Sequence, residues 1–162
     1  MNYTALKILK SIRKSLPLKQ LQLLMGHSYA YRCTHCGYEE YFNQGHGYLV
    51  HSQPVKEYLA QRTKLFHYKT HRLLKQLVKQ YDQLQMKAGF QVYMCTKCKV
   101  LYNKTEVTVF NEKEVVHKSE FRCRYCHTRL KLTNIHRLKK ATCPNCHKYS
   151  FHLDQTNHSL WD

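Results

Sequence analysis

The sequence predicts an α+β fold built of two small lobes, with a helical insertion in the first lobe and an amphipathic helix at the N-terminus. Three observations lead to this prediction. Every cysteine belongs to a Cys-x-x-Cys pair, helical periodicity runs through residues 53–88, and β-branched and aromatic residues crowd the segments near the later cysteine pairs. A chain of 162 residues divided into small lobes buries little apolar area. We therefore expect bound metal to contribute much of the folding free energy.

Residues 1–30 are predicted to form an N-terminal helical segment. Apolar residues recur at helical spacing from Leu6 to Leu16, basic side chains occupy the other faces, and Pro17 ends the pattern. This predicts an amphipathic basic helix that packs over one of the lobes. Half of a helix-turn-helix and a helix lying on a membrane surface are the alternatives. The membrane helix is disfavoured because the apolar face has no Trp or Phe.

The insertion over residues 53–88 is predicted to be one long helix. Pro54 suits the start of a helix and Gly89 suits its end. Apolar residues keep helical phase between these points, but the phase slips between His67 and His71. A helical hairpin is therefore the alternative.

Strands are expected around the later cysteine pairs. The segment 91–110 and the tail 149–153 are rich in the β-branched and aromatic residues that favour strands. Together with the cysteine positions, these segments divide the chain after the N-terminal helix into a first lobe, residues 31–110, and a second lobe, residues 111–162. The helical insertion belongs to the first lobe.

Four Cys-x-x-Cys pairs account for all eight cysteines of the chain. Two thiolates with two residues between them fit on one tight turn, a knuckle, and supply half of a tetrahedral zinc site. Four knuckles therefore predict two Cys₄ sites and two Zn²⁺ ions. The predicted ligands, in knuckles 1 to 4, are Cys33 and Cys36, Cys95 and Cys98, Cys123 and Cys126, and Cys143 and Cys146.

A disulfide framework is the competing interpretation of eight cysteines, and it requires an oxidising compartment. The N-terminus lacks the continuous apolar stretch of a secretory signal peptide. No segment approaches the roughly 18 apolar residues of a membrane span. We therefore expect a cytoplasmic protein without a transmembrane segment, whose cysteines bind metal.

The four knuckles can be combined into two sites in three ways. Knuckles 3 and 4 together have the C-x₂-C-x₁₆-C-x₂-C spacing of a zinc ribbon. We prefer this sequential pairing, with knuckles 1 and 2 joined across the insertion, because closing a loop costs less between neighbours. The main rival is an interleaved arrangement that joins knuckle 1 to knuckle 3 and knuckle 2 to knuckle 4.

With its knuckles in this order, the chain resembles the zinc-ribbon superfamily, and its layout is similar to that of small, uncharacterised bacterial proteins with four Cys-x-x-Cys motifs. The similarity covers about residues 31–150. It is carried by the tyrosine before knuckles 1 and 2, the Gly-x-Gly-Tyr of residues 45–48 and the Cys-Pro-x-Cys of knuckle 4. The resemblance implies two zinc-ribbon-like lobes. The chain departs from it in its basic charge and at Lys99, His127 and His147, where a glycine commonly follows the knuckle.

The chain is strongly basic, with 27 Lys and Arg against 10 Asp and Glu and a formal net charge of +17. Two Zn(Cys)₄ sites at −2 each would leave about +13. The positive charge is concentrated in residues 1–32, 53–88 and 121–148, and the last of these has no acidic residue. Because such a charge opposes folding by self-repulsion, we expect a polyanionic partner.

Nucleic acid, with RNA slightly ahead of DNA, is the partner that the pattern favours, because tyrosines among basic residues can stack on unpaired bases. The predicted phosphate contacts are Arg62, Lys64, Lys69, Arg72, Lys75, Arg122, Arg124, Arg129, Lys139 and Lys140. No catalytic residue or small-molecule substrate is predicted, since a Cys₄ zinc site has no open position and adjacent carboxylates are scarce. The alternatives are an adaptor that docks on an acidic protein or on the transcription or translation machinery, and a nuclease.

Overall fold

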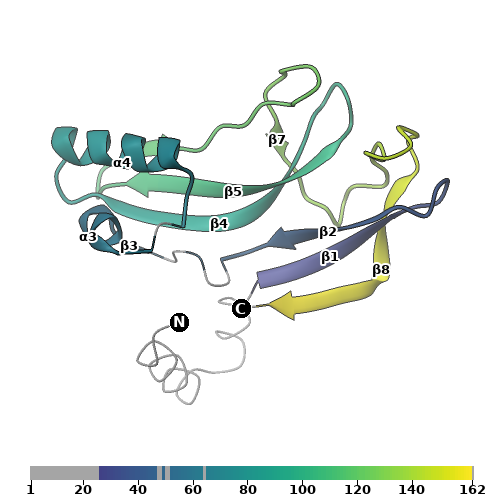
Figure 1. Cartoon of the computed structure of the whole chain (residues 1–162), viewed down its shortest axis with the longest axis horizontal. Helices are drawn as coiled ribbons and strands as arrows, with labels where there is room; N and C mark the ends of the chain where they lie inside the picture. Colours follow the sequence, from purple (N-terminus) through teal and green to yellow (C-terminus); the bar gives the residue numbers. More distant parts are fainter. Residues whose placement is uncertain (1–25, 47–48, 50–51, 64, 162) are drawn as a thin grey trace, which may run out of the picture.

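The computed structural model (Figure 1) describes residues 26–46, 49, 52–63 and 65–161. The predicted amphipathic helix near the N-terminus lies outside the described residues. Residues 26–30, which end the predicted helical segment, belong instead to a strand. The described chain is a mixed structure dominated by antiparallel sheet, and this is compatible with the α+β prediction.

The first sheet joins the beginning of the described chain to its end. Strand β1 (Gly26–Cys33) lies between β2 (Glu39–Gln44) and β8 (Phe151–Trp161), and both neighbours run antiparallel to it. The register places Cys33 opposite Phe151. This pairing brings knuckle 1, at the end of β1, beside knuckle 4, which precedes β8.

The core of the first sheet is aromatic. The rings of Tyr31, Phe42 and Phe151 are almost completely buried and contact one another, with ring centroids 5.4 to 6.3 Å apart. The Tyr31 hydroxyl donates a hydrogen bond to the Ile135 carbonyl at 3.1 Å, and burial raises the pKa of Tyr31 to about 12. Because the buried hydroxyl has a partner, the tyrosine can occupy the core without leaving a polar group unpaired.

The second sheet contains the long hairpin of the molecule. Strands β4 (Gln85–Met94) and β5 (Leu101–Phe110) pair along their whole lengths, and knuckle 2 connects them. Strand β6 (Val115–Lys118) pairs with β5. Two short strands, β3 (Gln53–Pro54) and β7 (Lys131–Leu132), pair with opposite ends of β4. The pairing with β7 brings knuckle 3, which precedes it, beside knuckle 2.

Two helices, α3 (Val55–Ala60) and α4 (Tyr68–Gln80), pack on the half of this hairpin that is remote from knuckle 2 (Figure 1). Alternate residues of both strands point into this contact, as the period of two in a strand requires. The buried residues of this core are Val55, Tyr58, Leu74, Leu77, Met86, Ala88, Val107 and Val109, with Leu49 and Leu84 at its border.

The prediction of one long helix over residues 53–88 was wrong. The segment forms two helices, as in the alternative prediction, and its last residues begin strand β4. Gly89 ends no helix but lies within β4, where a Cβ would stand 3.0 Å from the Gly45 carbonyl oxygen. Gly45 and Phe90 exchange two backbone hydrogen bonds of 3.0 and 2.8 Å. Gly89 therefore allows the backbones of the two sheets to approach each other.

The two sheets are also joined by the side chain of Asn103, which pairs with the backbone of Asn43 in β2. Its amide group donates to the Asn43 carbonyl at 2.6 Å and to the Gln91 carbonyl at 3.3 Å, and the Asn43 N–H donates back to Asn103 Oδ1 at 3.1 Å. The Asn103 side chain thus forms two hydrogen bonds with the Asn43 backbone, as the backbone of a residue in a neighbouring strand would.

We expect Asn103→Ala to lower the free energy of unfolding by about 1–3 kcal/mol, because it leaves the half-buried Asn43 N–H and carbonyl unpaired. Urea denaturation of the metal-loaded protein measures this loss. Thr105→Ala, on the same face of β5, is the control and should cost clearly less. Equal effects of the two substitutions would show that the Asn103 side chain does not join the sheets.

Candidate metal centres

All four knuckles have the same backbone turn. In each, the N–H of the first cysteine donates to the carbonyl five residues later, and the N–H four residues later donates to the carbonyl of that cysteine. The eight N···O distances lie between 2.8 and 3.0 Å. These bonds fix both thiols of a knuckle on one side of the turn.

The residue after the second cysteine of each knuckle lies in the left-handed region of backbone conformation. Its φ is 73° at Gly37, 57° at Lys99, 56° at His127 and 59° at His147. Only the first of these is the glycine that this conformation favours. The three positions at which the chain departs from the zinc-ribbon pattern are thus the three strained residues of the knuckles.

The eight thiols form two groups of four. Centre A consists of the cysteines of knuckles 1 and 4, and centre B of those of knuckles 2 and 3, with all four sulfurs of each group within 4.8 Å of one another. In centre A the Cys33–Cys146 and Cys36–Cys143 sulfurs are 3.6 and 3.8 Å apart. Four sulfurs at 2.3 Å from a tetrahedral ion would be separated by about 3.8 Å. Each centre therefore has the donors and the size to hold one metal ion.

The preferred sequential pairing of the knuckles was wrong, and the interleaved rival was wrong as well. The first knuckle shares a centre with the last, and the two middle knuckles share the other. The physical reason is strand pairing: β1 with β8 joins knuckles 1 and 4, and β4 with β7 joins knuckles 2 and 3. Both the sheet pairing and the grouping of cysteines cross the predicted lobe boundary at residues 110 and 111.

In each knuckle the first cysteine is buried and the second is more exposed. Polar groups surround the buried sulfurs. The Ser150 hydroxyl lies 3.1 Å from the Cys33 sulfur, and the Tyr102 hydroxyl lies 3.2 Å from the Cys123 sulfur. Such partners around the ligand atoms orient them and stabilise thiolates.

The thiols of centre B differ in their readiness to ionise. Hydrogen bonding with Thr128 lowers the pKa of Cys126 to about 6, whereas the hydrogen bond with Cys126 raises the pKa of Cys98 to about 12. Four neighbouring thiolates repel one another, so part of the group keeps its protons in the absence of a cation. A divalent ion at the centre would remove this conflict, and the group therefore fits a metal ion.

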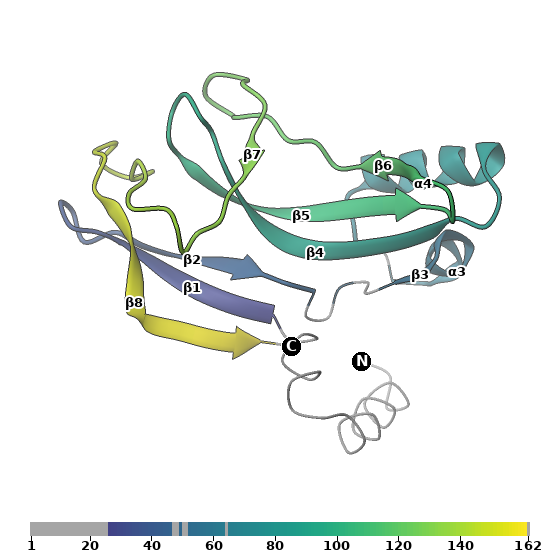
Figure 2. The ribbon, with the colours of Figure 1, turned by 180° about the vertical axis from the view of Figure 1, so that it is seen from behind.

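The predicted phosphate contacts fall into separate groups on the surface. Lys64 lies outside the described residues, and the other nine are exposed. Three of them, Lys69, Arg72 and Lys75, lie on helix α4. The predicted arginines Arg122, Arg124 and Arg129 lie in knuckle 3 or beside it. The helix and the cysteine-bearing loops lie at opposite ends of the β4–β5 hairpin in both views (Figure 2). The structure therefore does not gather the predicted contacts into one patch.

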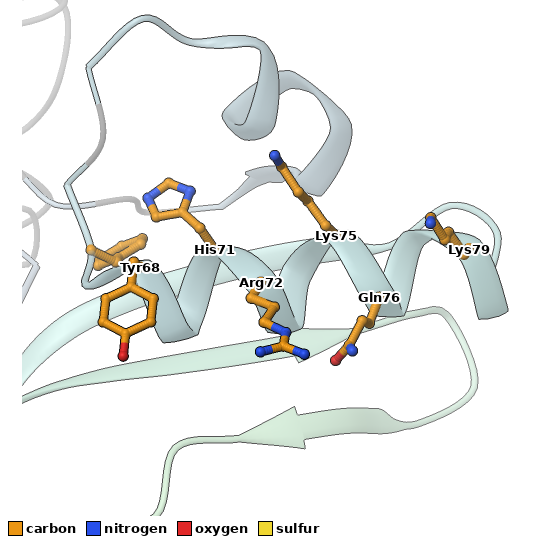
Figure 3. Close-up of a pocket in the computed structure, with 7 residues that line it drawn as sticks. Tyr68, His71, Arg72, Lys75, Gln76 and Lys79 are labelled. Atoms are coloured by element: carbon orange, nitrogen blue, oxygen red, sulfur yellow. The ribbon is translucent and has the colours of Figure 1, made fainter.

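Helix α4 carries a row of basic side chains beside an open hollow of about 600 Å³ (Figure 3). Arg72, Lys75 and Lys79 line it, together with the exposed ring of Tyr68. Helix α4 has no acidic residue. Lys79 was missed among the predicted contacts, although it stands one helical turn after Lys75 and so on the same side of the helix.

At knuckle 3 an arginine covers an exposed tyrosine. The Arg124 guanidinium lies 4.8 Å from the centre of the Tyr125 ring and donates a hydrogen bond of 2.7 Å to the Tyr125 hydroxyl. Nearby, Arg129 is paired with Glu120, and Arg122 donates to the His127 carbonyl. Of the nine described contacts, only Arg129 forms an ion pair within the described residues.

A comparison of the chain with protein-family models, with curated proteins and with solved structures finds no match. The resemblance to zinc ribbons therefore rests on the knuckles themselves. Within the described residues, no helix has both the length and the apolar character needed to cross a membrane.

The grouping of cysteines can be tested without mutation by ¹H–¹¹³Cd correlation NMR of the cadmium-loaded protein. We expect two ¹¹³Cd resonances, one coupled to the β protons of Cys33, Cys36, Cys143 and Cys146 and the other to those of Cys95, Cys98, Cys123 and Cys126. Cys33 and Cys95 coupled to one resonance would instead establish the sequential pairing.

Replacing each strained knuckle residue by glycine should stabilise the metal-loaded protein. We expect Lys99→Gly, His127→Gly and His147→Gly each to raise the free energy of unfolding by about 0.5–1 kcal/mol, because relief of left-handed strain exceeds the entropic cost of glycine. Lys97→Gly, in the same knuckle as Lys99 but not at a left-handed position, is the control and should destabilise. Denaturant midpoints measure both effects, and a loss of stability in all four variants would contradict the prediction.

Proposed function

We propose that centres A and B each hold one Zn²⁺ ion and that the zinc-bound protein binds nucleic acid through its positive charge. Four thiolates at tetrahedral spacing are the ligand set of a structural zinc site. Such a site is closed, so the metal contributes folding free energy and leaves no coordination position for a substrate. In this proposal each centre, with the strands that lead into it, forms a zinc-ribbon-like unit.

The observation that carries the proposal is unpaired positive charge on rigid elements. Three ion pairs are formed among the described residues, and none of them involves a basic residue of helix α4. Two zinc centres would leave a net charge of about +13. A surface of this kind attracts polyanions, and counterion release on neutralising several phosphates supplies most of the affinity for nucleic acid.

The separation of the basic groups points to an extended ligand. Helix α4 and knuckle 3 lie toward opposite ends of the β4–β5 hairpin, and a ten-residue strand such as β4 is about 30 Å long. One ligand that contacts both groups must cover a similar length, which corresponds to about nine base pairs at 3.4 Å each. A nucleic acid meets this requirement, whereas a small anion does not.

Exposed tyrosines beside both basic groups favour ligands with unpaired bases. Tyr68 is 66% exposed at the start of α4, and Tyr125 is 48% exposed beneath the Arg124 guanidinium. Base stacking on such rings adds about 1–3 kcal/mol per base and requires no sequence preference. Because such stacking needs unpaired bases, the proposal favours single-stranded or looped RNA over duplex DNA.

Titration of the zinc-loaded protein with single-stranded RNA, duplex RNA and duplex DNA over a salt series tests the proposal. We expect affinity to fall steeply with salt and to be greatest for single-stranded RNA. Arg72→Gln/Lys75→Gln/Lys79→Gln should reduce the slope of log K against log salt by about 2, at roughly 0.7 per lost phosphate contact on a single strand. The effect of Arg122→Gln/Arg124→Gln should be smaller and in the same direction.

The matched control removes the same charge elsewhere. Lys56, Lys87 and Lys113 are exposed residues outside both basic groups, and their replacement by glutamine should leave the slope nearly unchanged. No binding even at low salt rejects the proposal. A complex with an acidic protein that survives nuclease treatment would support the adaptor instead, and cleavage of the labelled RNA would support the nuclease.

A further inference from the structure

Three histidines from separate segments meet on one face of the first sheet, away from both cysteine centres. His27 lies on β1, His158 on β8, and His136 on the turn that follows β7. All three surround the ring of Tyr29. The Tyr29 ring stacks on His158 with a centroid distance of 4.8 Å, and the His136 ring meets it edge-on at 4.9 Å.

Strand register fixes the first two histidines beside each other. Tyr29 stands opposite His158, and His27 stands opposite Leu160. His27 and His158 are therefore diagonal neighbours on one face of an antiparallel pair, within reach of each other's rings. Their rings stack with a centroid distance of 5.3 Å and an angle of 15° between planes.

The two rings present their nitrogen atoms to each other. His27 Nδ1 and His158 Nε2 form a hydrogen bond of 3.1 Å, in which one ring nitrogen donates to the other. Two imidazole nitrogens on one metal ion at 2.0–2.1 Å would be about 2.9 Å apart at a right angle and about 3.4 Å apart at a tetrahedral angle. The observed separation lies between these values, so an ion can replace the shared proton once the two rings turn to direct both lone pairs at it.

The surroundings of His27 favour the form of its imidazole that binds metal. Burial, together with the charges of His158 and His136, lowers the pKa of His27 below its ordinary value of 6.5. A neutral imidazole offers a lone pair to a metal ion, whereas a protonated one does not.

We propose that His27 Nδ1 and His158 Nε2 form a third metal site, which takes a divalent transition-metal ion of the kind that imidazole prefers, such as Ni²⁺, Cu²⁺ or Zn²⁺. Water fills the remaining coordination positions, so the ion exchanges readily and binds more weakly than at a four-cysteine centre. His136 packs against Tyr29 and supports the pair without being a ligand. The site is independent of nucleic-acid binding.

Calorimetric titration of the two-zinc protein with Ni²⁺ tests the site. Ni²⁺ suits imidazole ligands, and a chromogenic zinc indicator in parallel detects any displacement from centres A and B. We expect one Ni²⁺ per chain without zinc release. Selective paramagnetic broadening of the His27 and His158 ring signals in NMR spectra would locate the ion.

His27→Gln and His158→Gln should each weaken Ni²⁺ binding about tenfold or more, because one of two protein ligands is lost. Acidification from about pH 7.5 to about pH 5.5 should weaken it similarly, because protons compete for the ring nitrogens. His152→Gln, on the same strand β8, is the matched control and should bind as the parent does, as should His136→Gln. The proposal is overturned if Ni²⁺ binding survives in the His27→Gln/His158→Gln variant, if bound Ni²⁺ appears only with released zinc, or if none binds.

Discussion

The pairing of β1 with β8 is the contact on which the rest of the molecule depends. It joins segments more than a hundred residues apart, places Cys33 opposite Phe151, and so brings knuckle 1 to knuckle 4. Two of the three rings of the aromatic core, Tyr31 and Phe151, lie on the same two strands. The two contributions support each other: a small core supplies little stability, and a metal centre needs its ligands held near one another. A metal ion in centre A and the sheet pairing would therefore stabilise each other, and loss of either is expected to weaken both.

The local chemistry of the chain was predictable, but its long-range arrangement was not. The Cys-x-x-Cys spacing dictates a turn with both thiols on one side, and all four turns are present. That spacing does not determine which two knuckles share a centre. The pairing of strands from distant segments brings particular knuckles together. The preference for neighbouring knuckles rested on the zinc-ribbon spacing of knuckles 3 and 4 and on the cost of loop closure, which changes slowly with length and so discriminates weakly between pairings.

The error in the insertion has a similar origin. The residues that follow α4 were assigned to a helix on the basis of apolar phase and of Gly89 as an end signal. In the structure they form β4, and Gly89 marks a close approach of two backbones. A glycine with either role looks the same in a sequence, so only the tertiary contact with Gly45 distinguishes them. The exposed basic residues were easier to identify, since charge keeps such side chains at the surface. Their division between α4 and knuckle 3 was not predicted, because it depends on where the β4–β5 hairpin places the helix relative to the knuckles.

The nested arrangement of the two centres also bears on the order in which they would take up metal. In centre B, Cys95 and Cys126 are 31 positions apart in the sequence. In centre A, Cys33 and Cys146 are 113 positions apart. The shorter loop costs about 1 kcal/mol less to close. Because the chain is made from its N-terminus, moreover, every ligand of centre B leaves the ribosome before the last knuckle does. If both centres hold metal as proposed, centre B could take up its ion before the knuckle that completes centre A has emerged. Metal loading would then follow the direction of translation, from the inner centre to the outer one.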